Sequence, residues 1–389
     1  MKRAFVVVVD ACGAGALPDA ADYGDAGTNT LAHLAEHLDG LHVPALARLG
    51  LGCILPLEGV APSDAPVLHG RLHPLGPGKD STVGHRELMG LVAGASPPTY
   101  PDGFPQEVLE VVRTASGRGI LGNRADDGIA AIENFGAEHL DSGSLIVYTS
   151  QDSVLQIAAH IDVVAPAQLY SICARVREGL PAEHAVGRVI ARPFAGPAGG
   201  FSRTDGRRDF ALRPPSPSYL EALCDSGVAV HSVGKVAQLF AGVGIDVAHP
   251  GATNAEALAC TSQLIGELES GLVFTNLIET DQVYGHRHDF DGFARALEEI
   301  DACVSRWLQQ LGDEDLLVLT ADHGCDLTSP RTDHTREHAP LLASFSGHGS
   351  RRHDGPLADV GASVLDWLAG TQVDELPGDS FVAGEGRDH

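Results

Sequence analysis

AFVVVVDACG, at residues 4–13, is the stretch from which the fold class follows. Its first six residues are apolar and rich in valine, which is typical of a strand buried on both faces of a sheet. Asp10 follows this strand directly, so its carboxylate would lie at the carboxyl edge of the sheet, where it can bind a cation. An Asp at this position can equally cap the following turn, and both roles stay open at this point.

Similar apolar runs recur along the chain and predict further parallel strands: Ser144–Thr149, Val228–Val233, Leu272–Leu277 and Leu316–Thr320. Helical patterns lie between them, at Thr30–His37, Tyr219–Asp225, Asn254–Ser270 and Phe293–Leu311. This alternation predicts an α/β fold with a mostly parallel sheet sandwiched by helices.

Two proline-rich segments suggest where the domains divide. They are SPPTYPDGFP (Ser96–Pro105) and RPPSPS (Arg213–Ser218). Because such segments stiffen connections between domains, we expect a smaller inserted domain at residues 97–216 and a core at residues 1–96 and 217–389. The alternative is that both segments are surface loops of a single domain.

Charge and cysteine content exclude several classes of protein. The chain has 389 residues, with 26 Lys and Arg against 52 Asp and Glu, a net charge of −26. Such an acidic balance disfavours nucleic acid and anionic membranes as partners. The seven cysteines show no CxxC spacing, which fits a reducing cytoplasm, and no run approaches the ~20 apolar residues of a membrane span.

Three short motifs combine Asp and His in polar contexts after predicted strands or in loops. They are DQVYGH (Asp281–His286), TADHG (Thr320–Gly324) and TDHTREH (Thr332–His338). With Asp10 they offer a set of oxygen and imidazole ligands that suits Mn²⁺, Mg²⁺ or Zn²⁺: Asp10, Asp281, His286, Asp322, His323 and His334. Two such metals about 3.5–4 Å apart clamp a phosphoryl group, so the set predicts an enzyme that moves or cleaves phosphate.

A nucleophile is expected in GKDSTVGHRELMG (Gly78–Gly90). Ser81 and Thr82 lie in a glycine-flanked turn before a predicted helix, where free N–H groups favour a phosphate. The same residues also fit a plain helix N-cap, and spacing alone does not choose between the two hydroxyls.

These motifs, in this order along nearly the whole chain, resemble those of the phosphopentomutase family in the alkaline phosphatase superfamily. The matching segments are VVVVDACGAGALPDAADYGDAGTNTLAHLAEH, GKDSTVGHRELMG, YTSQDSVLQIAAH, GRVIARPF, DQVYGHRHD, TADHG and TDHTREHAPLLA. The resemblance implies interconversion of α-D-ribose 1-phosphate and D-ribose 5-phosphate, and of their deoxyribose analogues, in nucleoside salvage. It also implies two Mn²⁺ ions, a phosphorylated hydroxyl residue, and an alkaline-phosphatase-like core with an inserted smaller α/β cap domain.

Residue by residue, the resemblance assigns Asp10, Asp322 and His323 to one metal and Asp281, His286 and His334 to the other. The family nucleophile follows the Asp of its GKDTxxGH motif, which falls on Ser81. The family usually has Thr there, whereas related phosphoglycerate mutases have Ser in NSxVGH, so Ser81 is preferred to Thr82. Arg86 stands where Trp is common in the family, and an extra phosphate contact is one interpretation of it.

Lys235, in VGK after a predicted strand, is a separate candidate for a phosphate contact. The resemblance also assigns substrate contacts in the cap: Asp152, Ser153, Arg188, Ile190, Arg203, and Arg207 or Arg208. The basic cluster among them would suit a distal phosphate, since guanidinium groups bind phosphate in a bidentate manner. A solvated basic face is the alternative.

Other functions remain open on the same scaffold. A phosphomonoesterase or a phosphoglycerate-type mutase would use the same metal ligands, although GRVIARPF and the Asp152 segment favour a pentose phosphate. A metal-binding protein without catalysis would have no need of the hydroxyl at Ser81, which is present.

Overall fold

The chain divides into two structural units with separate hydrophobic cores. The computed structural model describes residues 1–94, 98–150, 153–347 and 350–383. Met1–Ala95 and Pro214–His389 form one unit, here the core unit, and Ser96–Arg213 forms the other, here the insert unit. Which unit performs catalysis and which binds substrate stays a prediction.

The core unit is built on one mixed, mainly parallel sheet. Its strand order is β10-β9-β11-β1-β12-β13-β2-β14. Strands β10, β9, β11, β1 and β12 run parallel, whereas β13 runs antiparallel to both of its neighbours. The strands are β1 (Arg3–Val9), β2 (Leu68–His73), β9 (Val230–Val233), β10 (Val247–His249), β11 (Gly271–Leu277), β12 (Asp315–Thr320), β13 (Ala339–Ser344) and β14 (Gly355–Pro356).

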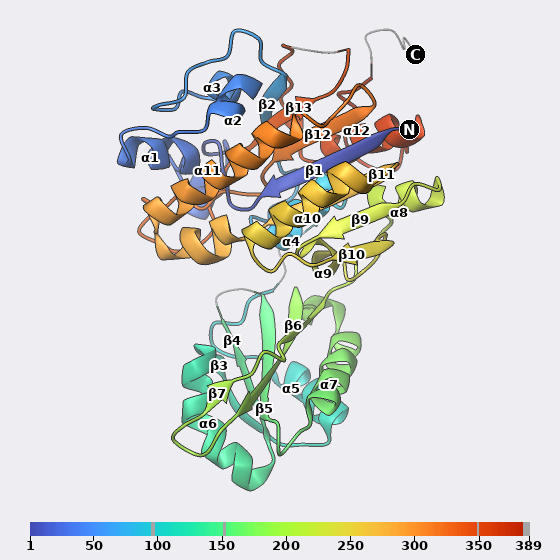
Figure 1. The fold of residues 1–389 in the computed structure, drawn as a ribbon. Helices are drawn as coiled ribbons and strands as arrows, with labels where there is room; N and C mark the ends of the chain where they lie inside the picture. The colour runs from blue at the N-terminus through green and yellow to red at the C-terminus, as the bar shows by residue number, and fades with distance from the viewer. Residues whose placement is uncertain (95–97, 151–152, 348–349, 384–389) are drawn as a thin grey trace. The chain divides into compact units, whose positions relative to one another are not determined.

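Helices cover both faces of this sheet, as the complete burial of Ala4 to Val9 in β1 requires. Helix α12 packs on β1, β11 and β12, and α10 packs on β11 and β9; α10 and α11 cross in front of the sheet in Figure 1. The helices are α1 (Thr30–His37), α2 (Pro44–Leu49), α3 (Leu51–Ile54), α4 (Ser81–Leu88), α8 (Tyr219–Asp225), α9 (Val236–Leu239), α10 (Asn254–Glu267), α11 (Phe290–Trp307) and α12 (Asp359–Ala369), with short turns η1 (Ala20–Tyr23), η3 (Thr280–Tyr284) and η4 (Gly285–Arg287).

The predicted fold class, α/β with a mostly parallel core sheet between helices, is confirmed. The helices Thr30–His37 and Tyr219–Asp225 have the predicted bounds. The helix predicted at Asn254–Ser270 ends at Glu267, because Leu268 turns to an extended conformation. The helix predicted from Phe293 begins at Phe290, because the Asp289 side chain caps it by accepting a hydrogen bond from the Gly292 amide.

The insert unit has its own smaller mixed sheet, with strand order β3-β4-β5-β6-β7 and β8 paired to β6. The segment predicted as a parallel strand, Ser144–Thr149, is β4; it runs parallel to β3 but antiparallel to β5. The elements are α5 (Gln106–Ser116), β3 (Ile120–Ala125), α6 (Gly128–Ser142), β4 (Leu145–Thr149), β5 (Val154–His160), α7 (Pro166–Gly179), η2 (Ala182–His184), β6 (Arg188–Ala195), β7 (Ser202–Arg203) and β8 (Arg208–Ala211).

The register of the core sheet determines where its polar residues gather. Val9 pairs with Leu277 and Val8 pairs with Thr320, so β11, β1 and β12 end at the same edge. The segments that follow these three strands therefore lie side by side. In the part of the chain that the structure describes, no helix is long and apolar enough to span a membrane.

Candidate metal centre

The edge where β11, β1 and β12 end carries buried carboxylates and imidazoles. Asp10 follows β1 and is fully buried, and Asp322 and His323 follow β12 with exposures of 4% and 3%. Asp281 lies in the turn η3 after β11 and is 7% exposed. Charged groups are rarely buried to this extent unless they are paired or bind a metal.

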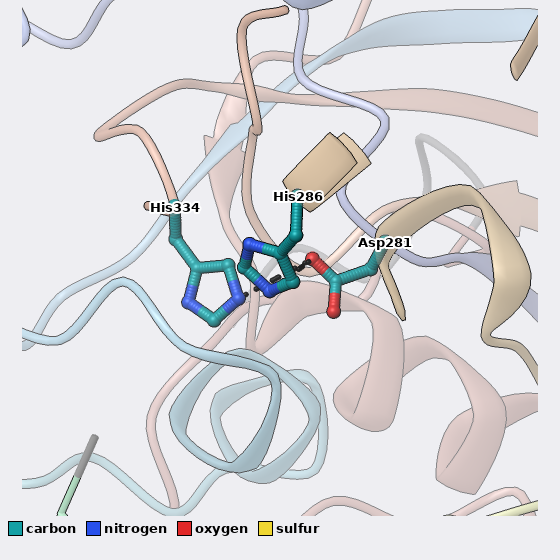
Figure 2. Close-up of side chains that lie close together, drawn as sticks. All are labelled: Asp281, His286 and His334. Carbon is teal, nitrogen blue, oxygen red and sulfur yellow. Dashed lines mark ion pairs between the residues drawn. The ribbon is translucent and has the colours of Figure 1, made fainter. Parts of the chain in front are cut away.

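One candidate metal group consists of Asp281, His286 and His334, whose ligand atoms lie within 4.8 Å of one another. Asp281 Oδ1 is 3.4 Å from His286 Nε2 and 3.3 Å from His334 Nε2. Figure 2 shows the two imidazole rings directed toward this carboxylate. Three segments separated in sequence thus offer one oxygen and two nitrogen ligands to one point.

A second candidate group consists of Asp10, Asp281 and His323, again within 4.8 Å. His323 Nε2 is 3.3 Å from Asp10 Oδ1 and 3.5 Å from Asp322 Oδ2. Asp322 was predicted to share this metal and lies beside the group, while Asp281 belongs to both groups. The structure thus brings the six predicted ligands together, and their division between two ions stays a prediction.

The residues fit divalent cations, because three buried ligand atoms have no hydrogen-bond partner among the described residues. They are Asp281 Oδ1, Asp322 Oδ2 and His334 Nε2, each of which lies within ion-pair distance of an oppositely charged group. A cation between them would supply the missing partner. Carboxylate oxygens with imidazole nitrogens suit Mn²⁺, Mg²⁺ or Zn²⁺.

Backbone carbonyls orient two of the imidazoles. His286 Nδ1 lies 2.6 Å from the Thr332 carbonyl oxygen, and His323 Nδ1 lies 3.0 Å from that of Gly324. If each Nδ1 donates its proton to the carbonyl, Nε2 of the neutral ring keeps its lone pair toward the centre. This second contact is typical of metal-ligating histidines.

The carboxylates respond differently to burial. Burial, followed by repulsion from Asp322, raises the pKa of Asp10 above its usual value. Burial acts on Asp281 in the same direction, but His334 and His286 outweigh it and hold the pKa of Asp281 well below its usual range. Asp281 therefore stays ionised and supplies a negative charge to both groups.

The imidazoles of His286 and His323 retain their protons when no metal is bound. The nearby Asp281 carboxylate, followed by the contact with Cys325, raises the pKa of His286 to about 11. Burial opposes the charged form of His323, but Asp322 and Asp10 outweigh it and raise the pKa of His323 well above its usual value. A divalent cation must displace these protons, so its binding is linked to pH.

Ser81 is the first residue of α4, and its hydroxyl lies next to the second group. Ser81 Oγ donates to Asp10 Oδ1 at 3.1 Å and lies 3.1 Å from His323 Nε2. Asp80 caps the helix by accepting hydrogen bonds from the Thr82 and Val83 amides. Among the described residues, the Ser81 hydroxyl contacts the candidate ligands, whereas Thr82 forms a hydrogen bond through its backbone amide, so the geometry favours Ser81 over Thr82 as the reactive hydroxyl.

A glycine permits the close approach of α4 to the ligand loop. A Cβ atom at Gly84 would lie 2.4 Å from the Asp322 carbonyl oxygen and 2.7 Å from its Cβ. Any side chain at this position would push the helix away from the loop after β12, and Ser81 with it.

Sequence reasoning missed two buried residues around the centre. His85 Nδ1 lies 2.9 Å from both the Ser81 carbonyl oxygen and Asp322 Oδ2. Asn276 in β11 donates from Nδ2 to Asp10 Oδ2 at 2.9 Å. His85 stands in the quoted GKDSTVGHRELMG motif, which was a usable signal, whereas nothing local marks Asn276.

The predicted substrate contacts of the insert unit have protein partners of their own. Ser153 Oγ donates to the Pro98 carbonyl oxygen at 2.6 Å and accepts from the Gly187 amide. Ile190 is buried, with 2% exposure. Asp152 lies outside the described residues.

Each of the predicted arginines lies near an acid. Arg207 forms two hydrogen bonds with Asp209, and Arg188 Nη1 lies 3.5 Å from the same carboxylate. Arg203 Nη2 lies 3.9 Å from Asp127 Oδ2. Their roles in substrate binding stay predictions.

Two further predicted phosphate contacts lie in the core unit. Lys235 Nζ donates to Gln282 Oε1 at 2.8 Å, beside the ligand Asp281. Arg86 Nε donates to the Leu239 carbonyl oxygen at 3.0 Å, at the end of α9. Arg86 thus contributes to packing α4 against α9, a role that the sequence did not suggest.

The chain matches known metalloenzymes over almost its whole length. The model of the Metalloenzyme superfamily matches residues 2–371. A phosphopentomutase of Caldanaerobacter subterraneus subsp. tengcongensis is 45% identical over 371 residues, covering 94% of each chain. A phosphopentomutase of Syntrophotalea carbinolica is 48% identical over 343 residues, covering 88% of this chain and 87% of the relative. A phosphopentomutase of an Anaeromyxobacter species is 46% identical over 386 residues, covering 98% of each chain.

Proposed function

This chain belongs to the phosphopentomutase family of the Metalloenzyme superfamily, and from that premise we propose how its residues interconvert α-D-ribose 1-phosphate and D-ribose 5-phosphate. Deoxyribose analogues are included, and the setting is nucleoside salvage in the cytoplasm. The observation that carries the proposal is the Ser81 hydroxyl, in contact with Asp10 and His323 at a double Asp/His cluster. The free thiols of all seven cysteines suit a reducing compartment.

Two divalent cations, Mn²⁺ in the first place and Mg²⁺ or Zn²⁺ otherwise, are proposed for the cluster. One would be held by Asp10, Asp322 and His323, the other by Asp281, His286 and His334. When bound, such ions neutralise charge on a transferring phosphoryl group and lower the pKa of a nearby hydroxyl. The three buried ligand atoms without a hydrogen-bond partner among the described residues support this assignment.

Ser81 is proposed as the residue that carries the phosphoryl group. In the first step the P–O bond to Ser81 Oγ breaks, and a bond forms to O1 of ribose 5-phosphate. The proton of the 1-hydroxyl replaces the phosphoryl group on Ser81, and the product is ribose 1,5-bisphosphate. After this product reorients, its 5-phosphoryl group returns to Ser81 and leaves ribose 1-phosphate. The start of α4 favours this site, because it places the Ser81 hydroxyl against Asp10 and His323.

Other residues of the chain would orient and protect the reacting groups. Asp10 accepts the Ser81 hydroxyl proton in a hydrogen bond and so directs the oxygen. Arg188, Arg203, Arg207 and Lys235, with Asp152, Ser153 and Ile190, are proposed to hold the pentose phosphate. Binding the bisphosphate at two ends would keep it from water while it reorients.

The competing functions are separated by one assay. Purified protein is incubated with ribose 1-phosphate, and ribose 5-phosphate and free phosphate are followed together. A mutase forms ribose 5-phosphate with little free phosphate, whereas a phosphomonoesterase releases phosphate in step with substrate loss. Mass spectrometry of the same sample should find a phosphate on Ser81. Absence of both reactions with saturating Mn²⁺ and a bisphosphate activator would leave only a metal-binding role.

A further inference from the structure

The loop after β1 carries a buried carboxylate that belongs to neither metal group. Asp25 is 1% exposed, although its neighbours Gly24 and Ala26 are exposed. A charged side chain that is buried within an exposed loop requires partners, because an uncompensated buried charge is strongly unfavourable.

Asp25 finds these partners on two other segments. Its Oδ2 accepts from Lys79 Nζ at 2.9 Å and from the Arg336 amide at 3.0 Å. Its Oδ1 accepts from Arg331 Nη2 at 2.5 Å. Both oxygens of one carboxylate are thus occupied by donors that are far from it in sequence.

The two segments held by Asp25 carry key residues of the proposed reaction. Lys79 stands two positions before Ser81, and Arg331 and Arg336 lie on either side of His334. Neither segment is part of a helix or strand at these positions. Isolated bridges at Thr335 and Glu337 hold the second segment to its neighbours, and side-chain contacts link it to the first.

Additional contacts join the same segments. Arg336 Nη1 donates to the Gly78 carbonyl oxygen at 2.7 Å, and Tyr23 Oη donates to that of Pro77 at 2.8 Å. Lys79 Nζ also lies 3.6 Å from Asp333 Oδ2, on the residue before His334. The nucleophile turn and the His334 loop are therefore tied together through the loop that carries Asp25.

We propose that Asp25 is a positioning residue that sets the Ser81 turn and the His334 loop at a fixed separation. The consequence for catalysis rests on the proposed mutase function, whereas the consequence for metal binding does not. Because the Lys79–Asp25 pair is largely shielded from water, with side-chain exposures of 19% and 1%, its attraction is weakly screened by salt. Loss of the charge would release both segments, so metal affinity and phosphoryl transfer would weaken together.

The test is the variant Asp25→Asn, which keeps the size of the side chain and removes its charge. Mn²⁺ binding is measured without substrate, from the loss of the free-ion signal in electron paramagnetic resonance. We expect the weaker of the two Mn²⁺ affinities to fall about tenfold to a hundredfold, as for other residues that orient metal ligands. In the mutase assay kcat should fall by a similar factor, while KM for ribose 5-phosphate changes less than about threefold, because Asp25 does not touch the substrate.

The matched control is Asp315→Asn. Asp315 is also buried and forms an ion pair with Arg3 at 2.7 Å, but it lies at the opposite end of β12 from Asp322. This variant should lower thermal stability and leave Mn²⁺ affinity and kcat unchanged. A merely structural role for Asp25 would make the two variants behave alike.

Lys79→Met removes the other member of the same ion pair. It provides the test if Asp25→Asn does not fold. The double variant should be little worse than the more affected single variant, since both act through one contact. Wild-type Mn²⁺ affinity in Asp25→Asn or Lys79→Met, with the protein folded, would overturn the proposal. If the wild-type protein shows no mutase activity, the proposed function fails, and the Mn²⁺ titrations still decide the role of Asp25.

Discussion

The metal centre of the core unit and the arginines of the insert unit differ in how their polar groups are paired. In the core unit, Asp281 and His334 are buried with ligand atoms that have no hydrogen-bond partner among the described residues. In the insert unit, Arg207, Arg188 and Arg203 lie against carboxylates of their own chain. An unsatisfied buried atom indicates a missing ligand, whereas a paired surface charge is already complete and gives no such indication.

The two units also differ in charge. The core unit carries almost all of the excess of acidic residues, while acidic and basic side chains nearly balance in the insert unit. An anionic substrate is repelled by the core unit at long range, so bound cations must reverse the sign at its centre. The nearly balanced insert unit repels such a substrate much less.

Replacing Ser81 should have the largest effect of the variants that compare the core unit with the insert unit. Ser81→Ala should lower mutase activity at least about a thousandfold, because among the described residues the Ser81 hydroxyl is the one that contacts both Asp10 and His323. Mn²⁺ binding should persist, since the six proposed ligands remain. Thr82→Ala is the control and should keep most of the activity; the reverse result would move the nucleophile to Thr82.

Removing one metal ligand should have the next largest effect. His334→Ala should weaken one Mn²⁺ site about a hundredfold or more while the other persists, measured by calorimetric titration. Thermal stability without metal should fall as well, because the buried Asp281 carboxylate loses the imidazole that helps to hold its pKa below the usual range. Equal loss at both sites would show that the two groups act as one.

Removing an arginine of the insert unit should affect binding more than turnover. Arg207→Met should raise KM for ribose 5-phosphate about tenfold with kcat within about threefold, the pattern of a group that binds substrate and transition state equally. Steady-state kinetics with Arg175→Met as a control, on a different part of the same unit, measures this effect. An unchanged KM would favour the alternative of a solvated basic face.

The smallest of these effects is the response of metal affinity to pH. Because the pKa of His286 is raised to about 11 and that of His323 well above its usual value, both rings are protonated at neutral pH when no metal is bound. Lowering the pH therefore favours the metal-free protein, and raising it favours metal binding. For each proton displaced, Mn²⁺ affinity should rise about tenfold per pH unit, with proton release detectable in weakly buffered solution. An affinity independent of pH would contradict this linkage.

The sequence predicts the parts of the fold that have a simple local pattern. Apolar runs such as Ala4–Val9 mark strands buried on both faces, and these were found. Strand β2, LHGRLH, mixes His and Arg with Leu and has no such pattern, so it was missed. Strand β13, with the sequence APLLAS, was missed because it follows a polar loop and has a proline as its second residue.

The candidate site shows the same division between local and distant information. Asp and His residues that follow strand ends serve few functions in proteins. Residue type and position alone were therefore enough to identify six residues that the structure brings together. Asp25 and Asn276 act through partners more than fifty residues away in the chain, and no local pattern marks them. Ser153 is the opposite case. Serine residues serve many functions, so the residue type alone predicts little, and Ser153 Oγ already forms hydrogen bonds with two backbone groups.

The central position of β1 has a consequence for the order in which the chain folds during synthesis. Its partners β11 and β12 begin at Gly271 and Asp315, so the first strand to leave the ribosome must wait for the last third of the chain. The insert unit is continuous from Ser96 to Arg213 and has all of its strands much earlier. Domains that are complete first generally fold first. The N-terminal segment, with its run of four valines, therefore remains unpaired until most of the chain has been synthesised, and we expect this apolar strand to need a chaperone during that time.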